Sequence, residues 1–216
     1  MNILLFDASH RISGMMTAYY QKVYALDFTD KLNGKGSLYQ YINGQDPVQL
    51  ITFDLLDDQD ISMESWLNKN NIQFDTVINN LEHLIGNTLT ETSIDEWRKS
   101  LFINLHLPFL IIKAFISYVP DDGQIIHISS TAAVSGEAGD VSYASHKSGL
   151  ESFSKSLSKE LSKRNIRSNV ISISPKCWRK PDGARQIIQL LKETCNEHMS
   201  FLNGQVITLD NGETLS

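Results

Sequence analysis

The stretch from residue 124 to residue 175 decides how this chain folds. It begins with Q-I-I-H-I-S-S at Gln124–Ser130, continues through a loop of small residues to S-Y-A-S-H-K at 142–147, and ends with R-S-N-V-I-S-I-S-P at 167–175. Between the two strand-like runs, apolar residues recur at spacings of three and four: Leu150, Phe153, Leu157 and Leu161. This spacing predicts a helix over about 142–163. A strand, a helix and a second strand in this order predict two parallel strands joined by a crossover.

The same alternation extends along the whole chain. Further strands are expected at 2–6, 23–28, 49–56, 76–81 and 205–210, and further helices at 15–22, 61–70, 93–118 and 182–198. The helix that starts at Ser93 is the best marked, because S-I-D-E is a capping box with Glu96 at the third helical position. The pattern predicts one α/β domain over residues 1–216, with a doubly wound, Rossmann-type parallel sheet of about seven strands and helices on both faces.

Composition narrows the class of protein. The chain has 216 residues, of which 41% are hydrophobic and 20% charged, with a formal net charge of −6. This balance suits a globular protein with one sizeable core. It shows none of the excess of basic residues that nucleic-acid binding requires. No signal peptide and no apolar run long enough to span a bilayer are expected, so the expected location is cytoplasmic. Cys177 and Cys195 suit a reducing compartment, and the six scattered histidines form no metal-ligand pattern.

Tyr143, Lys147 and Ser130 are the candidate catalytic residues. Tyr143 and Lys147 are four residues apart and therefore share a helix face, and Ser130 lies thirteen residues before the tyrosine at a strand end. A lysine ammonium beside a tyrosine hydroxyl is expected to lower its pKa from about 10, which suits proton transfer near neutral pH. The alternative is that Y-x-x-x-K is an accident and the serines form only a polar loop.

The combination resembles the short-chain dehydrogenase/reductase family over nearly the whole chain. V-I-N-N-L-E at 77–82 is similar to the family's N-N-A-G element, with Leu81 and Glu82 in place of alanine and glycine. Asn104 matches the asparagine of the family's long fourth helix, and L-N-G-Q-V-I-T-L-D-N-G at 202–212 is similar to its T-G-Q-x-x-x-V-D-G-G ending.

The resemblance implies a role for each candidate residue. Tyr143 is the general acid/base, Lys147 lowers its pKa and holds the cofactor ribose, and Ser130 orients the substrate oxygen. Asn104 supports a water relay to Lys147, and its alternative is a polar residue that accommodates a helix irregularity near Pro108. The implied cofactor is NAD or NADP, and the implied cofactor contacts are Ser9, Arg11, Asp27, Asp54, Asn80 and Lys147.

The cofactor loop departs from the family pattern. Where the family has T-G-x-x-x-G-x-G, this chain has F-D-A-S-H-R-I-S at 6–13, so Asp7, Arg11 and Ser13 stand at the three glycine positions. Side chains there crowd a pyrophosphate, although Arg11 can bind a phosphate directly. Asp27, expected at the end of the second strand, is either a ribose ligand or a solvated turn aspartate. Asp54 is either an adenine contact or part of an acidic turn.

The segment after Pro175 is short. Residues 176–181 are all that separates Pro175 from the last long helix, so the family's substrate lid is reduced to a stub.

Three functions stay open. The first function is an NAD(P)-dependent oxidoreductase acting on a small-molecule substrate. The second is a dehydratase or isomerase that uses the Tyr143–Lys147 pair without nicotinamide. The third is a non-catalytic partner or scaffold. In the family the two long helices commonly build a homodimer or tetramer face, so a homo-oligomer is expected.

Overall fold

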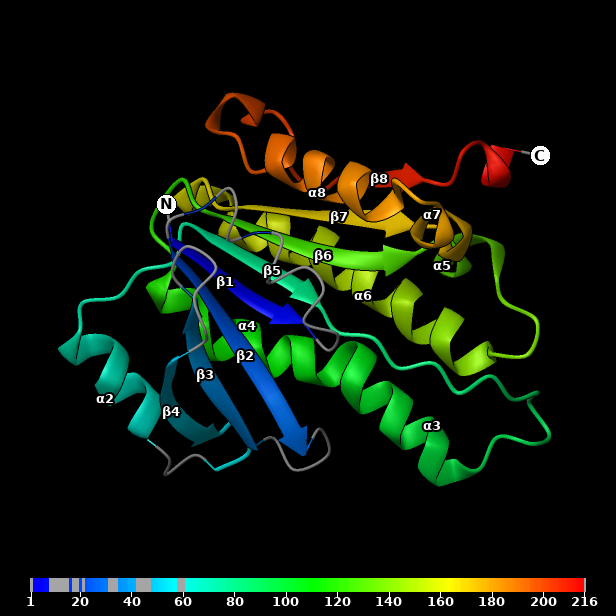
Figure 1. Cartoon of the computed structure of the whole chain (residues 1–216), viewed down its shortest axis with the longest axis horizontal. Helices are drawn as coiled ribbons and strands as arrows, with labels where there is room; N and C mark the ends of the chain where they lie inside the picture. Colours follow the sequence, from blue (N-terminus) through cyan, green and yellow to red (C-terminus); the bar gives the residue numbers. More distant parts are fainter. Residues whose placement is uncertain are drawn as a thin grey trace.

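An eight-stranded mixed sheet forms the centre of the molecule (Figure 1). The computed structural model describes residues 2–7, 16, 20, 22–30, 35–41, 48–57 and 61–215. The strands are β1 (Asn2–Asp7), β2 (Lys22–Asp30), β3 (Lys35–Tyr41), β4 (Val48–Asp54), β5 (Thr76–Asn80), β6 (Gln124–Ser130), β7 (Arg167–Ile173) and β8 (Val206–Leu209). Their order across the sheet is β4-β3-β2-β1-β5-β6-β7-β8.

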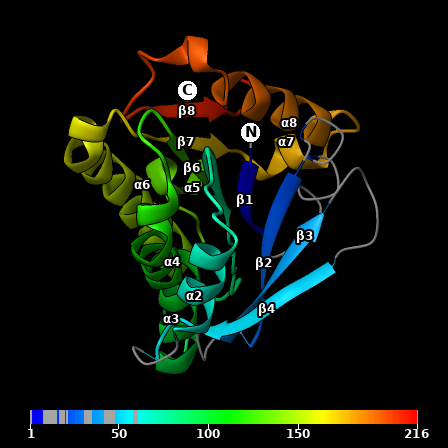
Figure 2. The same ribbon diagram turned by 90° about the vertical axis from the view of Figure 1, so that its left-hand side faces the viewer.

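Helices cover both faces of this sheet (Figures 1 and 2). One face carries α2 (Ser62–Lys69), α3 (Ile94–Leu101), the π-helical turn η1 (Phe102–His106), α4 (Leu107–Phe115) and α6 (Val141–Glu160). The other face carries α7 (Pro175–Arg179) and α8 (Gly183–Thr194). The short segments are η2 (Ile116–Tyr118), α5 (Ala132–Ser135), η3 (Leu161–Arg164), η4 (Glu197–Met199) and η5 (Glu213–Leu215). The predicted layers of a doubly wound α/β fold are therefore confirmed.

The unit predicted from the 124–175 stretch is present. β6 and β7 pair in parallel, and α6 lies between them in the chain and packs on both. All seven residues of each strand are buried, as expected for strands covered on two sides. The carboxyl ends of β5 and β6 therefore meet the start of α6 at one edge of the sheet.

The expected alternation fails between β2 and β4. β3 is a strand that the sequence interpretation missed, and it pairs antiparallel with both β2 and β4. A three-strand meander thus replaces a crossover, and the sheet has eight strands instead of seven. The residues between β2 and β3 read K-L-N-G, and Asn-Gly is a strong hairpin signal that pointed to this arrangement. The expected helix at 15–22 lies largely outside the described residues.

The helical run from Ile94 to Tyr118 begins as predicted. Ser93 accepts a hydrogen bond from the Glu96 N–H, and the Glu96 side chain accepts one from Ser93, which completes the capping box. By length and apolar composition alone this segment is able to cross a membrane, which corrects the expectation that no segment is. Five of its apolar side chains belong to the core beneath it: Ile103, Leu107, Ile111, Ile112 and Phe115.

Candidate active site

The three predicted catalytic side chains come together at the carboxyl edge of the sheet. β6 ends at Ser130, and Tyr143 and Lys147 follow on successive turns of the same face of α6. The Ser130 hydroxyl hydrogen-bonds the Tyr143 phenol oxygen, and Lys147 Nζ lies 5.6 Å from the centre of the Tyr143 ring. All three are buried, with exposed fractions of 2%, 4% and 1% for Ser130, Tyr143 and Lys147. The three residues that the sequence placed at one edge of the sheet therefore form one cluster.

Lys147 anchors this cluster to two strands. Its Nζ donates to the Leu81 carbonyl oxygen after β5 at 2.9 Å and to the Ile128 carbonyl oxygen in β6 at 3.2 Å. Burial lowers the pKa of Lys147 to about 8, and the Glu82 and Glu151 carboxylates oppose that shift. An ammonium with three N–H groups has one donor left after these two bonds. That remaining donor is the one available to a ligand.

The expected lowering of the Tyr143 pKa is wrong. Burial raises the pKa of Tyr143 well above its usual value, and the nearby Glu82 carboxylate raises it further. Only the Ser130 hydrogen bond acts in the opposite direction. The tyrosine hydroxyl donates to Glu82, which favours the neutral phenol. Tyr143 is thus held protonated at neutral pH.

Glu82 is a site residue that the sequence interpretation did not include. It follows Leu81 directly, and its carboxylate stands beside both the Tyr143 hydroxyl and the Lys147 ammonium. The signal was present, because Glu82 occupies the position where the related family motif has glycine. A glutamate there brings a negative charge into the cluster that glycine does not.

Asn104 supports the loop that carries Glu82. It lies in the π-helical turn η1, where its side chain is fully buried. Its amide accepts from the His83 N–H at 3.0 Å and donates to the His83 carbonyl at 2.8 Å. Asn104 also donates to Ser100 Oγ at 3.1 Å. The helix irregularity proposed for this position is present, and the water relay to Lys147 stays a prediction.

Asp140 connects the same loop to the start of α6. It is the N-cap of α6, and its Oδ1 accepts from the Tyr143 N–H at 3.1 Å and the Ser142 hydroxyl at 3.0 Å. Its Oδ2 accepts from the Ile85 and Gly86 N–H groups at 2.7 and 3.0 Å. Burial alone raises the pKa of Asp140, but these four hydrogen bonds outweigh it and lower the pKa. Asp140 therefore positions Tyr143 relative to the loop after β5.

The predicted cofactor contacts are only partly brought together. Asn80 ends β5 opposite Asp7, beside the catalytic cluster. Asp27 lies inside β2, which continues to Asp30, so its expected place at a strand end is wrong. Asp54 ends β4, and β3 lies between it and Asp27, so two strand spacings of about 4.8 Å each separate their strands. Ser9 and Arg11 lie outside the described residues.

The Asp54 side chain itself forms a local turn. Its Oδ1 accepts from the Leu56 N–H at 2.9 Å, as in a turn capped by an aspartate. This bond agrees with the acidic-turn interpretation of the sequence.

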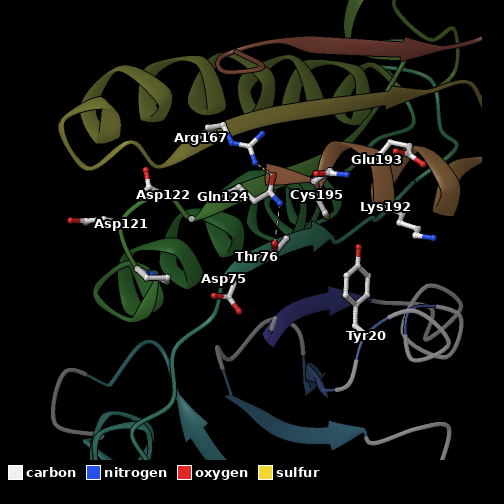
Figure 3. Close-up of a pocket in the computed structure, with 13 residues that line it drawn as sticks. Tyr20, Asp75, Thr76, Asp121, Asp122, Gln124, Arg167, Lys192, Glu193 and Cys195 are labelled. Atoms are coloured by element: carbon white, nitrogen blue, oxygen red, sulfur yellow. Dashed lines mark hydrogen bonds between the residues drawn. The ribbon is translucent and has the colours of Figure 1, made fainter. Parts of the chain in front are cut away.

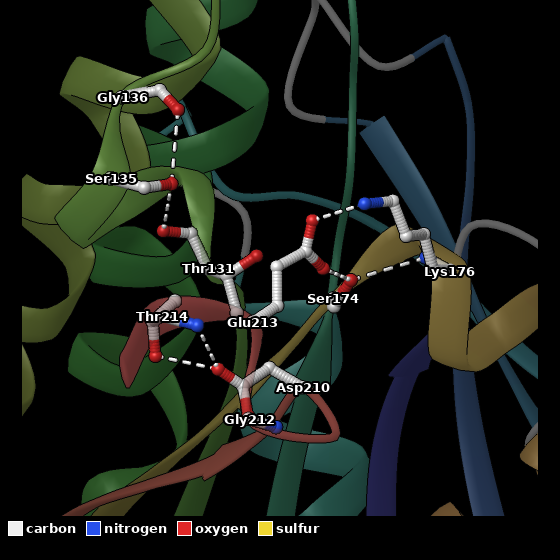
Figure 4. Close-up of polar contacts among 9 residues, drawn as sticks. All are labelled: Thr131, Ser135, Gly136, Ser174, Lys176, Asp210, Gly212, Glu213 and Thr214. Carbon is white, nitrogen blue, oxygen red and sulfur yellow. Dashed lines mark hydrogen bonds and ion pairs between the residues drawn. The ribbon is translucent and has the colours of Figure 1, made fainter. Parts of the chain in front are cut away.

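The segment after β7 is held by the C-terminal residues (Figure 4). Ser174 Oγ donates to Glu213 Oε2 at 2.7 Å, and Lys176 Nζ contacts Glu213 Oε1 at 2.5 Å. The Asp210 carboxylate stabilises the turn that carries Glu213, because it accepts hydrogen bonds from the Gly212 and Thr214 N–H groups. This network places residues 210–215 beside the carboxyl end of β7, where the sequence predicts a substrate lid reduced to a stub.

A cavity lies at the opposite edge of the sheet, at the amino ends of β5, β6 and β7 (Figure 3). Its volume is about 650 Å³. Arg167 in its wall donates to Gln124 Oε1 and to the Met199 carbonyl, both at 2.9 Å, and Gln124 donates to Thr76 Oγ1 at 3.0 Å. None of the predicted site residues lines it. This cavity is therefore separate from the catalytic cluster.

Comparison with known proteins supports the resemblance. A family model described as Enoyl-(Acyl carrier protein) reductase matches residues 21–196. The 3-oxoacyl-(acyl-carrier-protein) reductase of Chlamydia pneumoniae is 33% identical over 112 residues, which are 51% of this chain and 45% of that protein. The corresponding reductase of Salmonella typhimurium is 33% identical over 145 residues, which are 65% of this chain and 53% of that protein. The chain thus spans about half the length of these curated relatives.

Solved structures share the fold over the full length. A short-chain dehydrogenase family protein from Francisella tularensis superposes with a TM-score of 0.77 at 18% identity, covering 100% of this chain and 99% of that one. The 4-hydroxyisoleucine dehydrogenase complexed with NADH and succinate gives a TM-score of 0.74 at 20% identity, covering 99% and 100%. Because the family model covers most of the residues, this chain belongs to the short-chain dehydrogenase/reductase family and is related to its 3-oxoacyl-(acyl-carrier-protein) reductases.

Proposed function

We propose that this protein is an acid/base enzyme acting on the carbonyl or hydroxyl group of a small molecule, as an oxidoreductase of its family. The observation that supports this most is the buried cluster in which Ser130 hydrogen-bonds Tyr143 and Lys147 stands behind the phenol ring. Three groups capable of proton transfer or of stabilising charge meet at the carboxyl edge of the sheet, where open α/β folds place their ligands.

Each side chain has a distinct role in carbonyl reduction. Tyr143, held as a neutral phenol, donates its proton to the substrate oxygen as negative charge develops there. Ser130 donates a hydrogen bond to the same oxygen and keeps it in line with the phenol. Lys147 stabilises the phenolate that remains, because its ammonium is buried and fixed by two carbonyl groups. The raised pKa of Tyr143 keeps the side chain in its protonated form, the form that can donate a proton, at neutral pH.

The described residues fit a nicotinamide cofactor at one end only. The free N–H of Lys147 and the Tyr143 hydroxyl suit the ribose hydroxyls beside the nicotinamide, provided that Glu82, which is exposed, turns away. At the adenine end, the interposed strand β3 separates Asp27 from Asp54. Two structural neighbours are described as complexes with NADH and with NADPH. Cofactor use by this chain rests on family membership, and the adenine contacts differ from those that the resemblance implies.

Glu82 favours a second candidate function, which is acid/base chemistry without nicotinamide. Its carboxylate accepts the hydrogen bond of the Tyr143 hydroxyl and stands beside the Lys147 ammonium. A carboxylate and a phenol in contact can pass one proton between them and a substrate, which is what a dehydratase or an isomerase requires. In this arrangement no hydride source is needed.

Titration of purified, cofactor-free protein with NADH and NADPH tests these two functions. We expect micromolar binding by calorimetry, and binding at least tenfold tighter to a Glu82→Gly variant, because one competing hydrogen bond of about 1.4 kcal/mol is removed. Glu137→Ala, on an exposed loop residue, is the control and should bind as the wild type does. A screen for NAD(P)H-dependent reduction of small carbonyl compounds then follows.

The absence of nucleotide binding would decide against the oxidoreductase proposal. If neither wild type nor Glu82→Gly binds either nucleotide at millimolar concentration, the oxidoreductase proposal is wrong. Turnover of dehydratase or isomerase substrates by the cofactor-free protein then supports the second function.

We also propose that the protein forms a homodimer through its long helices. An apolar groove of about 430 Å³ runs along α3, η1 and α4 beside α6. Its lining residues are Arg98, Leu101, Phe102, Leu105, His106, Phe109 and Phe153. Phe109 is 45% exposed and Leu101 36%, and together with the other apolar residues of the groove they form one contiguous apolar surface, the kind that marks interaction sites. A second copy of the same face would cover them, as the family resemblance implies.

Phe109→Glu should convert the dimer to a monomer, because it places a charge in the centre of the apolar groove. Sedimentation velocity measures the change directly. Phe201→Glu is the matched control, since Phe201 is fully exposed and lies outside this groove. A dimer that persists in Phe109→Glu, or a wild type that is monomeric at micromolar concentration, would refute this interface.

A further inference from the structure

Helix α6 turns a polar stripe toward the sheet. Lys147, Glu151, Ser154 and Ser158 recur at spacings of four, three and four, and each is at most 6% exposed. The sheet faces this stripe with polar groups as well, namely His127 and Ser129 on β6 and Ser168 and Ser172 on β7. Contacts between a helix and a sheet are usually apolar, because a buried polar group needs a hydrogen-bond partner. Each polar group of this stripe therefore needs a hydrogen-bond partner.

Part of the stripe is internally satisfied. Ser154 Oγ and Ser168 Oγ lie 2.8 Å apart, and Ser158 Oγ donates to the Lys155 carbonyl at 2.8 Å. Lys147, at the N-terminal end of the stripe, donates hydrogen bonds to two carbonyl groups. None of these hydrogen bonds involves the helical turn around Glu151.

Of the four buried atoms without a partner in this contact among the described residues, one is His127 Nε2 and the other three surround Glu151. Ser129 and Ser172 are direct neighbours across β6 and β7, and Glu151 lies over them on α6. Among the described residues, Glu151 Oε1, Ser129 Oγ and Ser172 Oγ are all buried without a partner in full hydrogen-bonding geometry, although both hydroxyls lie close enough to the Glu151 carboxyl to lower its pKa. Three buried acceptors and donors in one place are the setting in which proteins bind ordered water.

We propose that Glu151, Ser129 and Ser172 form an internal water site directly beneath Lys147, and that Glu151 is a positioning residue that controls the charge of the lysine ammonium through this site. The part concerning Lys147 rests on the proposed function. Glu151 lies one helical turn after Lys147, so their side chains are neighbours on the buried face. Nothing in the proton transfer described above uses this carboxyl group.

The charges around the pair support this role. Burial raises the pKa of Glu151, while the Ser129 and Ser172 hydroxyls and the Lys147 and Lys155 ammonium groups lower it. From β6, His127 also faces Lys147, and burial lowers the pKa of His127 to about 3, so this ring is neutral. The loop after β5 contributes Glu82, and the part of β7 that faces the pair contributes only serine hydroxyls. Glu151 is therefore the buried carboxyl that supports the positive charge of Lys147.

The test is a pH titration of the lysine side chains by NMR in the full-length protein labelled with ¹³C at lysine Cε. Lys147→Arg identifies the Lys147 signal, whose wild-type pKa is expected to be about 8. In Glu151→Gln this pKa should fall, because a carboxylate that favours the ammonium is replaced by a neutral amide of the same shape. Glu160→Gln, an exposed glutamate on the same helix, is the matched control and should leave the signal unchanged. An unchanged Lys147 pKa in Glu151→Gln would overturn the positioning role.

A crystal structure that shows ordered water tests the site itself. We expect at least one water bonded to Glu151 together with Ser129 or Ser172, and its loss or displacement in Ser172→Ala. Direct bonds from Glu151 to both serines without water would overturn the water site. If Glu151→Gln does not fold, the lysine titration of Ser172→Ala decides the coupling, since loss of the water should shift the Lys147 pKa there too. Neither measurement needs a substrate, so failure of the proposed enzyme activity is distinguishable from failure of this inference.

Discussion

Tyr143→Phe is expected to lower turnover by roughly 10²–10⁴-fold, the range for loss of a general acid. The variant keeps the aromatic ring and removes only the hydroxyl that hydrogen-bonds Ser130 and Glu82. Because Glu82 is exposed and water can replace the lost hydroxyl as its partner, the free energy of unfolding should change by no more than about 1 kcal/mol. Steady-state kinetics with the substrate found in the carbonyl screen, together with thermal unfolding, measure both effects.

A matched control makes this result specific. Tyr118 is another tyrosine of the same chain, and its hydroxyl makes only two long hydrogen bonds, of 3.3 and 3.4 Å, at the surface near α2. Tyr118→Phe should therefore keep full turnover. If Tyr143→Phe also keeps full turnover, Tyr143 is not the proton donor. If the cellular function then persists as well, the scaffold hypothesis gains over both enzyme hypotheses.

Asp140→Ala is expected to destabilise the protein by about 2–3 kcal/mol. It removes the N-cap of α6, which contributes about 1 kcal/mol, and deprives the Ile85 N–H in its half-buried loop of an acceptor at 2.7 Å. For a chain of this size the melting temperature should fall by roughly 4–12 °C. Differential scanning calorimetry measures this change, and Glu137→Ala in the preceding exposed loop should leave the melting temperature unchanged.

The effect of Asp140 should also depend on pH. Its pKa is lowered in the folded protein, so its stabilising contribution is fully present above the ordinary aspartate pKa of about 3.9 and is lost as pH falls through the folded value. The difference in unfolding free energy between wild type and Asp140→Ala should therefore be constant from pH 5 to 7 and shrink below about pH 4. A difference that grows as the pH falls in this range would show that the four hydrogen bonds to the carboxylate do not stabilise the fold.

Some of this protein was determined by its sequence alone, because the deciding interactions are local. The apolar spacing after Lys147 predicted α6, and the capping box at Ser93 predicted the start of the long helical run. The isoleucine- and valine-containing runs of β6 and β7, separated by one helix, indicated a buried parallel sheet. Because helical and strand periods place side chains on defined faces, the sequence also predicted that Ser130, Tyr143 and Lys147 share one edge.

Other features were decided only by the tertiary structure. The Tyr143 pKa is raised because burial and Glu82 outweigh the nearby ammonium, and neither effect is visible in the spacing of residues. β3 separates Asp27 from Asp54 because strand pairing depends on contacts between distant segments, and its short, half-polar sequence carried little signal beyond Asn-Gly. Asp140 and Glu151 matter through partners that lie on other elements: the β5 loop for Asp140, and Ser129 and Ser172 for Glu151. Local periodicity places side chains on a face, whereas packing determines what each buried polar group meets there.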